Sequence, residues 1–237
     1  MIKRLGIFSG AVIALVMISA TALAGCGVNI GGVTLERPSA STILATAEKQ
    51  TWKDATFKFT VAVTSTSATG TSTGTGTVTT HPQRSDIHAT TSSSLGNQTD
   101  EVITDGSTAY VKTPGQSKWL KITGNPSSLS GAGGISPTSP VNFGSLQNVT
   151  FVGAETVEGY KTWHVKGTTA QTVSGKTVTS NIDVWVRQDN SYIVQVKSHS
   201  VESGATGAVD TTITFTKWNT GVTITPPPAS DVTTQAS

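Results

Sequence analysis

The chain has 237 residues, of which 16 are Lys or Arg and 14 are Asp or Glu, so its formal net charge is only +2. Charged residues make up 13% of the chain, about half the share of an average soluble protein, which argues against an electrostatic nucleic-acid binder. The sequence also contains 42 threonines and a single cysteine. This composition favours β-strands and excludes an internal disulfide.

The N-terminus has the features of a bacterial lipoprotein signal. Lys3 and Arg4 precede an apolar run over residues 5–22, which ends in Leu23-Ala24-Gly25-Cys26. A basic start, an apolar segment and small residues before a cysteine are typical of a lipobox. We therefore predict cleavage before Cys26, attachment of a diacylglyceryl group to its thiol, and anchoring to the outer face of the cytoplasmic membrane, or to an outer membrane where one exists. The alternative is an uncleaved transmembrane anchor over residues 5–22.

The remaining chain predicts one domain between short flanking segments. Residues 1–25 are the predicted signal peptide, residues 26–38 a lipidated N-terminus and short tether, residues 39–227 the domain, and residues 228–237 a disordered tail. We expect the mature protein to be a monomer.

One helix is expected at the start of the domain, from Ser39 or Ser41 to about Thr51. Its apolar face carries Ile43, Leu44 and Ala47. This face is apolar enough to lie on a sheet.

The hydrophobic period then changes to two, as in strands with one solvated face. In residues 56–64, Phe57, Phe59, Val61 and Val63 alternate with polar or small residues. A Ser/Thr/Gly tract over residues 65–75 predicts a long hairpin end. Further strands are predicted over residues 77–81, 85–91, 97–104, 108–113, 117–123, 148–154, 155–157, 161–169, 176–187, 192–201 and 210–218. A Gly/Ser/Pro segment at 124–140, and a helix or turn at 141–147, separate the two runs of strands.

These elements predict a mainly β fold with few helices and about ten or eleven antiparallel strands in one large curved sheet. The sheet either folds over as a packed sandwich or barrel, or it leaves an apolar cavity. Because most apolar strand faces are simply core, the pattern alone favours the packed form. The candidate cavity residues on the helix and the inner sheet face are Ile43, Leu44, Ala47, Phe57, Phe59, Val61, Val63, Ile182, Val184, Val186, Ile213 and Phe215.

The sequence does not predict an enzyme or a metal site. Gly70-Thr-Ser72-Thr-Gly74 matches the GxSxG pattern, but a nucleophile elbow needs a helix after the serine and strand is predicted there. The four histidines, His81, His88, His164 and His199, lack the spacing of metal ligands. Asp100, Glu101 and Asp105 are expected at a strand edge and a turn rather than around a cation. No cofactor is expected beyond the lipid on Cys26.

Other polar and aromatic side chains have structural interpretations. Asp183 and Arg187 fall on the solvated face of one strand, where they could form a surface pair. Trp163, Trp185 and Trp218 are expected to pack against neighbouring elements, with Trp185 facing away from the cavity.

Several segments in a fixed order resemble a known family. The lipobox and the helix are followed by Gly76 to Pro82, by Asp105-Gly106 before Tyr110, and by Trp119. Glu155-Thr-Val-Glu-Gly159, Trp163, Val184-Trp185-Val186 and a late strand ending at Trp218 come after the Gly/Ser/Pro segment. This order over residues 39–227 resembles the LppX/LprG family of lipoproteins, which belongs with the carriers LolA and LolB.

The resemblance implies a half-open antiparallel β-barrel plugged by short helices around a cavity for acyl chains. It implies a non-enzymatic protein that binds a membrane lipid, a glycolipid or a lipoprotein acyl chain and carries it within the cell envelope. The chain departs from the family at residues 124–140, where relatives tend to have more apolar helix, so the resemblance does not define the cavity mouth or the size of the ligand. A module that binds another envelope protein or senses envelope stress is the alternative function, and a hydrolase is the third.

Overall fold

The computed structural model describes residues 28–30, 33–35, 37–65, 69–94, 96–123, 143–173 and 176–234, with only the backbone described for residues 28–35 and 173. Cys26 and the segment 124–140 lie outside the described residues. The chain forms two units, Met1–Arg37 and Pro38–Ser237. In the first, β1 (Val28–Ile30) and β2 (Val33–Leu35) pair as a small antiparallel hairpin within the predicted tether. No helix in the described parts of the chain is long and apolar enough to cross a membrane.

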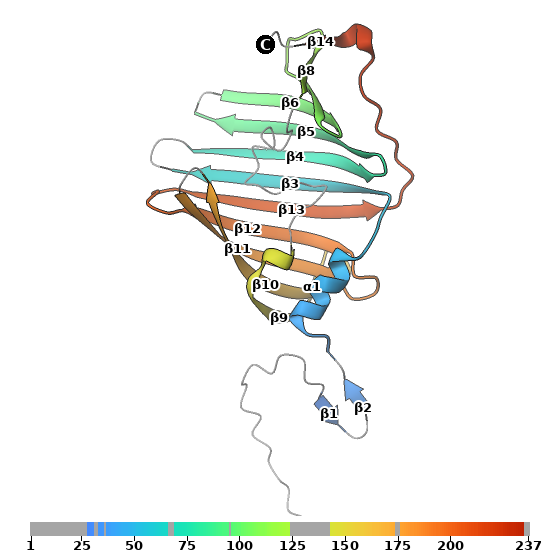
Figure 1. Ribbon diagram of the computed structural model, residues 1–237, viewed down its shortest axis with the longest axis vertical. Coiled ribbons are helices and arrows are strands. Elements are labelled where there is room, and N and C mark those ends of the chain that lie inside the picture. Colours follow the sequence, from blue (N-terminus) through green and yellow to red (C-terminus); the bar gives the residue numbers. More distant parts are fainter. Residues whose placement is uncertain are drawn as a thin grey trace, which may run out of the picture. The chain divides into compact units, whose positions relative to one another are not determined.

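The second unit is built on one sheet of twelve strands (Figure 1). In chain order the strands are β3 (Asp54–Thr64), β4 (Thr69–Thr80), β5 (Gln83–Ser93), β6 (Gly96–Asp105), β7 (Thr108–Lys112), β8 (Trp119–Thr123), β9 (Gln147–Val157), β10 (Tyr160–Val173), β11 (Lys176–Arg187), β12 (Ile193–Glu202), β13 (Ala208–Trp218) and β14 (Val232–Thr234). Their order across the sheet is β14-β8-β7-β6-β5-β4-β3-β13-β12-β11-β10-β9. All neighbours are antiparallel except β14, which runs parallel to β8. The sheet curves without closing, so the predicted half-open antiparallel barrel is confirmed.

One α-helix, α1 (Ala40–Glu48), occurs among the described residues and packs on one face of this sheet. Ser39 caps its N-terminus, because the Ser39 side chain accepts a hydrogen bond from the Thr42 amide at 3.1 Å. The buried Ile43, Leu44 and Ala47 face β9, β10, β11 and the short 3-10 helix η2 (Phe143–Ser145). We call the sheet face beneath α1 the inner face and the opposite one the outer face.

The Ser/Thr/Gly tract at residues 65–75 is strand from Thr69 onward, so the predicted hairpin end is wrong over most of its length. Threonines occupy every second position of β4, where they suit an extended backbone. The intervening glycines make room for aromatic rings on β3. A Cβ at Gly74 would lie 2.7 Å from the Phe59 ring and 2.2 Å from the His88 carbonyl oxygen.

Residues 148–157, predicted as two strands, form the single strand β9.

The C-terminal tail also differs from its prediction. The sheet continues into residues 228–237, where we predicted disorder, through the 3-10 helix η3 (Ala229–Asp231) and β14. The polar tail residues are ordered because the β8 edge offers free backbone groups for pairing.

The segment between β13 and η3 runs along the side of the sheet to reach β8 (Figure 1). Its first residues bind the buried carboxylate of Asp54, which accepts bonds from the Thr220 amide at 2.7 Å, the Thr220 hydroxyl at 2.6 Å and the Gly221 amide at 2.9 Å. Farther along, Arg84 donates to the Ile224 carbonyl at 2.9 Å. Burial opposes ionisation of Asp54, but its hydrogen bonds outweigh this effect and hold the pKa of Asp54 below its ordinary value.

We predict that Asp54→Asn lowers the free energy of unfolding by about 1–3 kcal/mol at pH 7, because it leaves buried donors without their carboxylate. A carboxyl whose pKa is lowered by folding stabilises above its unfolded pKa, and this stabilisation is lost as the pH falls below about 5. Urea unfolding from pH 7 to pH 3 will therefore show a shallower loss of stability for Asp54→Asn than for the wild type. Asp210→Asn, which changes an exposed carboxylate, is the control. Equal acid sensitivity of the wild type and Asp54→Asn would contradict the prediction.

We also predict that Gly74→Ala lowers the free energy of unfolding by about 1–3 kcal/mol, because the added methyl group meets backbone and ring atoms. Gly153→Ala is the matched strand control, since a Cβ at Gly153 meets no atom within 4 Å. Thermal and urea unfolding of both variants measure the difference. Similar stabilities for the two variants would show that the contact between β3 and β4 is not tight.

Candidate functional site

The inner face carries a continuous row of apolar side chains across five strands. The strand register places Phe59 of β3 beside Ile213 of β13, then Val196 of β12, Val184 of β11 and Val165 of β10. Val165, Val184 and Val196 are fully buried, whereas Phe59 is half-buried. The row begins under α1 and extends beyond it.

The structure brings most of the predicted cavity residues together in one apolar cluster. Val61 is buried on the same face but outside this cluster, and Val63 is 37% exposed near the end of β3. Phe57 packs between its neighbours, with ring centroids 6.0 Å from Phe215 and 6.3 Å from Phe59. The predicted residues in the cluster are Ile43, Leu44, Ala47, Phe57, Phe59, Ile182, Val184, Val186, Ile213 and Phe215.

The apolar inner face is larger than the area that α1 covers. The helix lies over β9 to β11, at one end of the sheet (Figure 1). Beyond β3, half-buried apolar side chains continue the inner face on β5 to β8. In register order they are Ile87, Val102, Val111 and Leu120. These residues are hard to recognise from the sequence, because the strands are short and rich in Thr and Ser and their alternation of apolar and polar residues is weak.

The polar groups of the inner face are uncharged through most of its length. Ser200 bonds Ser180 at 2.8 Å and Ser198 at 3.1 Å, so these hydroxyls satisfy one another. On the described parts of β3, β4 and β11 to β13, charged inner-face side chains occur only at the rim, where Lys176 pairs with Glu202. This surface offers apolar contact and a few hydroxyls, and it carries no acid–base pair of the kind that catalysis uses.

Ser72, the serine of the GxSxG match, lies inside β4, where its hydroxyl accepts a bond from Thr91 at 3.2 Å. Strand continues after it to Thr80, so the helix that a nucleophile elbow requires is replaced by sheet. The GxSxG match is therefore a result of composition.

A polar cluster occupies the outer face behind the apolar row. His164 lies 2.7 Å from Asp183 and 2.9 Å from Glu155, and its ring stacks on Trp185 with centroids 4.2 Å apart. The Trp185 indole donates to Glu155 at 2.7 Å. Trp185 thus faces away from the inner face and packs on a neighbouring strand, as predicted. Asp183 and Arg187 do not form the surface pair that their spacing allowed, because Asp183 pairs with His164 and Arg187 with Asp189.

Arg187 belongs to an aromatic cluster where β10 begins and where β11 and β13 end. Its guanidinium pairs with Asp189 at 2.5 Å and lies 4.1 Å from the Tyr160 ring and 5.5 Å from the Trp218 ring. The hydrogen bond from Arg187 lowers the pKa of Asp189. Trp163 instead packs on Phe151 on the inner face, with centroids 5.8 Å apart.

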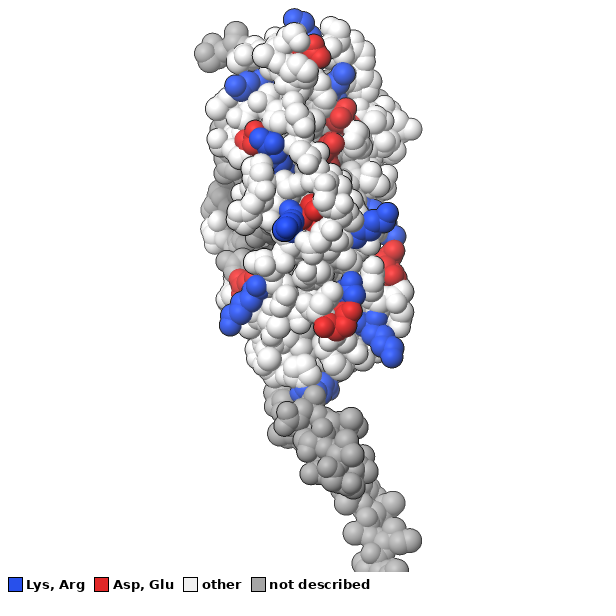
Figure 2. Space-filling model, turned by 90° about the vertical axis from the view of Figure 1, so that its right-hand side faces the viewer, with Lys and Arg blue, Asp and Glu red and all other residues white. Residues whose placement is uncertain are grey.

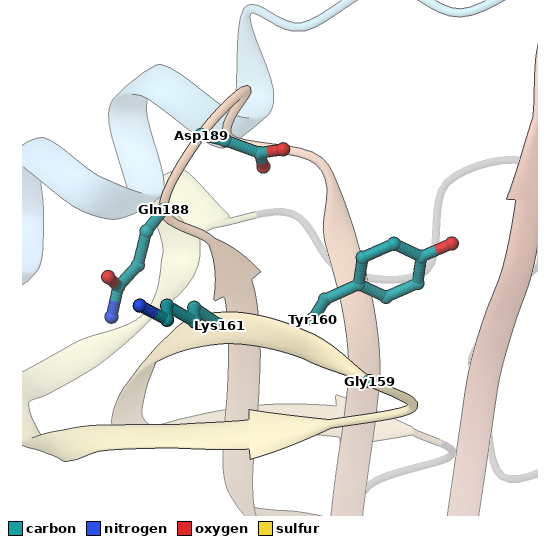
Figure 3. Close-up of a pocket in the computed structure, with 5 residues that line it drawn as sticks. All are labelled: Gly159, Tyr160, Lys161, Gln188 and Asp189. Atoms are coloured by element: carbon teal, nitrogen blue, oxygen red, sulfur yellow. The ribbon is translucent and has the colours of Figure 1, made fainter.

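A cavity of about 360 Å³ lies beside this aromatic cluster, between two strand turns (Figure 3). The side chains of Lys161 and Gln188 extend toward one another, while the Tyr160 ring points away from them. Gln188 also donates to the Thr162 carbonyl at 3.1 Å. Because Asp189 is already paired with Arg187, the cavity presents no free pair of catalytic groups. Its lining residues are Gly159, Tyr160, Lys161, Gln188 and Asp189.

Charged side chains do not gather into a patch of one sign on the side of the molecule shown in Figure 2. Lys and Arg are interspersed with Asp and Glu, and uncharged atoms separate them. The extended apolar inner face is therefore the more distinctive candidate site.

Residues 39–224 match the model of the LppX_LprAFG lipoprotein family. Among solved structures, LprF from Mycobacterium bovis has a TM-score of 0.54 at 19% identity, with 79% of this chain and 96% of LprF covered. LppX from Mycobacterium tuberculosis also has a TM-score of 0.54, at 15% identity, with 78% of this chain and 98% of LppX covered. No curated protein shows significant similarity to the chain.

At these identities the solved structures establish the shared fold alone. The family model spans most of the chain and nearly the whole predicted domain, so the resemblance found in the sequence is confirmed. The chain belongs to the LppX_LprAFG lipoprotein family.

Proposed function

We propose that the protein binds the acyl chains of a membrane lipid or lipoprotein on its inner face and carries them within the bacterial envelope. The observation that supports this proposal most directly is the extent of the inner face, which stays apolar on strands that α1 does not cover. Leaving each methylene of an acyl chain in water costs about 0.8 kcal/mol. A carrier therefore needs a dry surface as long as the chain that it removes from a bilayer.

The chemistry of the inner face is compatible with such a ligand. Half-buried Phe59, Ile87 and Leu120 offer apolar contact area, and uncharged hydroxyls such as that of Ser200 lie toward one end of the strands. Binding and release of this kind require no titratable catalytic group, so we propose a non-enzymatic function.

Attachment to the membrane through Cys26 completes the proposal. A diacylglyceryl group, with or without a further acyl chain, holds a protein stably at a bilayer where one chain is marginal. The binding domain would then work close to the lipids from which it takes its ligand.

Lipid binding is tested on residues 27–237, which lack the signal and the acyl anchor, after purification from a bacterial host without detergent. We expect organic extraction and mass spectrometry to recover acyl lipid in about a one-to-one ratio, or the protein to take up a fluorescent fatty acid. A folded monomer that carries no lipid and takes none up would refute the carrier function and favour binding to another envelope protein.

A matched pair of variants locates the binding surface. Val63 and Val201 are 37% and 38% exposed on the inner and outer faces respectively. We predict that Val63→Lys weakens uptake of the fluorescent fatty acid about tenfold, because an acyl chain bound over the lysine would strip water from its ammonium. Val201→Lys is expected to leave uptake unchanged, with circular dichroism as the check on folding. Equal effects of the two variants would place the ligand elsewhere.

The anchor is tested separately by growing cells with a fatty acid that can be labelled after lysis. The full-length wild type should incorporate the label and lose residues 1–25, whereas Cys26→Ser should do neither. An unlabelled wild-type protein that keeps its N-terminus would support the transmembrane anchor over residues 5–22.

A further inference from the structure

Three metal-ligating side chains meet on the outer face, away from the apolar inner face. Asp86 and His88 are two residues apart on β5, and Glu101 of β6 pairs directly opposite His88. Because side chains alternate along a strand, this register places all three on the same face. One ligand atom of each residue lies within 4.8 Å of the other two.

The separations are close to those of ligands around one metal ion. His88 Nε2 lies 3.4 Å from Asp86 Oδ1 and 3.9 Å from Glu101 Oε1. A tetrahedral zinc ion with ligands at about 2.0–2.1 Å holds neighbouring ligand atoms about 3.3 Å apart. The His88 side chain is 57% exposed, so an ion can reach the three groups from solvent.

One of these ligand atoms is buried and has no hydrogen-bond partner. Asp86 Oδ1 is the only side-chain polar atom among the described residues that is fully buried without a hydrogen bond. It faces His88 Nε2, but 3.4 Å is too long for a good bond. The Asp86 side chain as a whole is 32% exposed, and a cation between Asp86, His88 and Glu101 would give its buried oxygen a direct ligand bond.

Two other histidines of the outer face lack this arrangement. His199 lies 2.7 Å from Asp210 and has no second carboxylate within ion-pair distance among the described residues. His164 has a carboxylate within 2.9 Å of each ring nitrogen, so both nitrogens are engaged. Lys112 is opposite Glu101 on β7, but its ammonium lies over the Trp119 ring, 5.5 Å from the centroid.

We propose that Asp86, His88 and Glu101 bind a divalent transition-metal ion such as Zn²⁺ on the outer face. One imidazole and two carboxylates are ordinary zinc ligands, and three protein ligands leave a position for water. The ion would join β5 to β6, whose inner-face residues Ile87 and Val102 lie in register. This site does not depend on lipid binding, because its ligands are on the opposite face of the sheet.

The experiment uses residues 38–237 without a histidine tag. This unit contains the whole twelve-stranded sheet, α1 and the apolar cluster of the inner face, and it lacks Cys26, the only thiol that would bind zinc. Competition with a chromogenic chelator measures Zn²⁺ binding, and Co²⁺ absorption reports the coordination geometry. We expect about one ion per chain and a higher unfolding temperature with Zn²⁺.

Two variants test the assigned ligands, and a third is the control. We expect His88→Gln and Asp86→Asn each to weaken Zn²⁺ binding about tenfold or more. His199→Gln, which removes an outer-face histidine beside a single carboxylate, is expected to bind like the wild type. The proposal is overturned if the wild type binds no Zn²⁺, since the three groups are then an ordinary ion-pair cluster. It is equally overturned if His199→Gln loses as much affinity as His88→Gln.

Discussion

The pairing of β3 with β13 is the contact on which the rest of the structure depends. It joins the strands from β4 to β8, which follow one another in sequence, to the second run from β9 to β13. The two partners are about 150 residues apart in the chain, so the contact is costly in loop entropy. Side-chain contacts reinforce this pairing. Phe57 contacts Phe215 on the inner face, and Thr56 bonds Thr216 at 2.9 Å. At the end of the pair, Asp54 binds the residues that follow β13.

Because one sheet forms most of the described part of the domain, its two faces can have different roles. The inner face buries apolar side chains under α1 and remains apolar farther along the sheet, whereas the outer face carries hydroxyls, carboxylates and histidines. Without a disulfide, the burial of apolar side chains and strand pairing must stabilise the fold. The proposed acyl-chain surface and the proposed metal site are on opposite faces, so evolution can change either one without disturbing the other's contacts.

The same separation explains why several titratable groups have structural roles. His164 and Trp185 stack behind the apolar row and connect β9, β10 and β11 through Glu155 and Asp183. At the sheet end, Arg187 lies against Tyr160 and Trp218 and pairs with Asp189. Each of these groups holds neighbouring strands together, which is the usual role of polar residues on an outer sheet face.

The sequence by itself determined the local structure and the family. Alternation of apolar residues located β3, β11 and β13, the Ser39 cap located α1, and the order of turns and tryptophans identified the LppX_LprAFG family. These features depend on residues close together in the chain. Only the tertiary structure decided that residues 69–75 form strand, that the tail adds β14, and that Val63 lies outside the main cluster. It alone brought Asp86, His88 and Glu101 together, because the register of β5 and β6 sets which distant side chains meet.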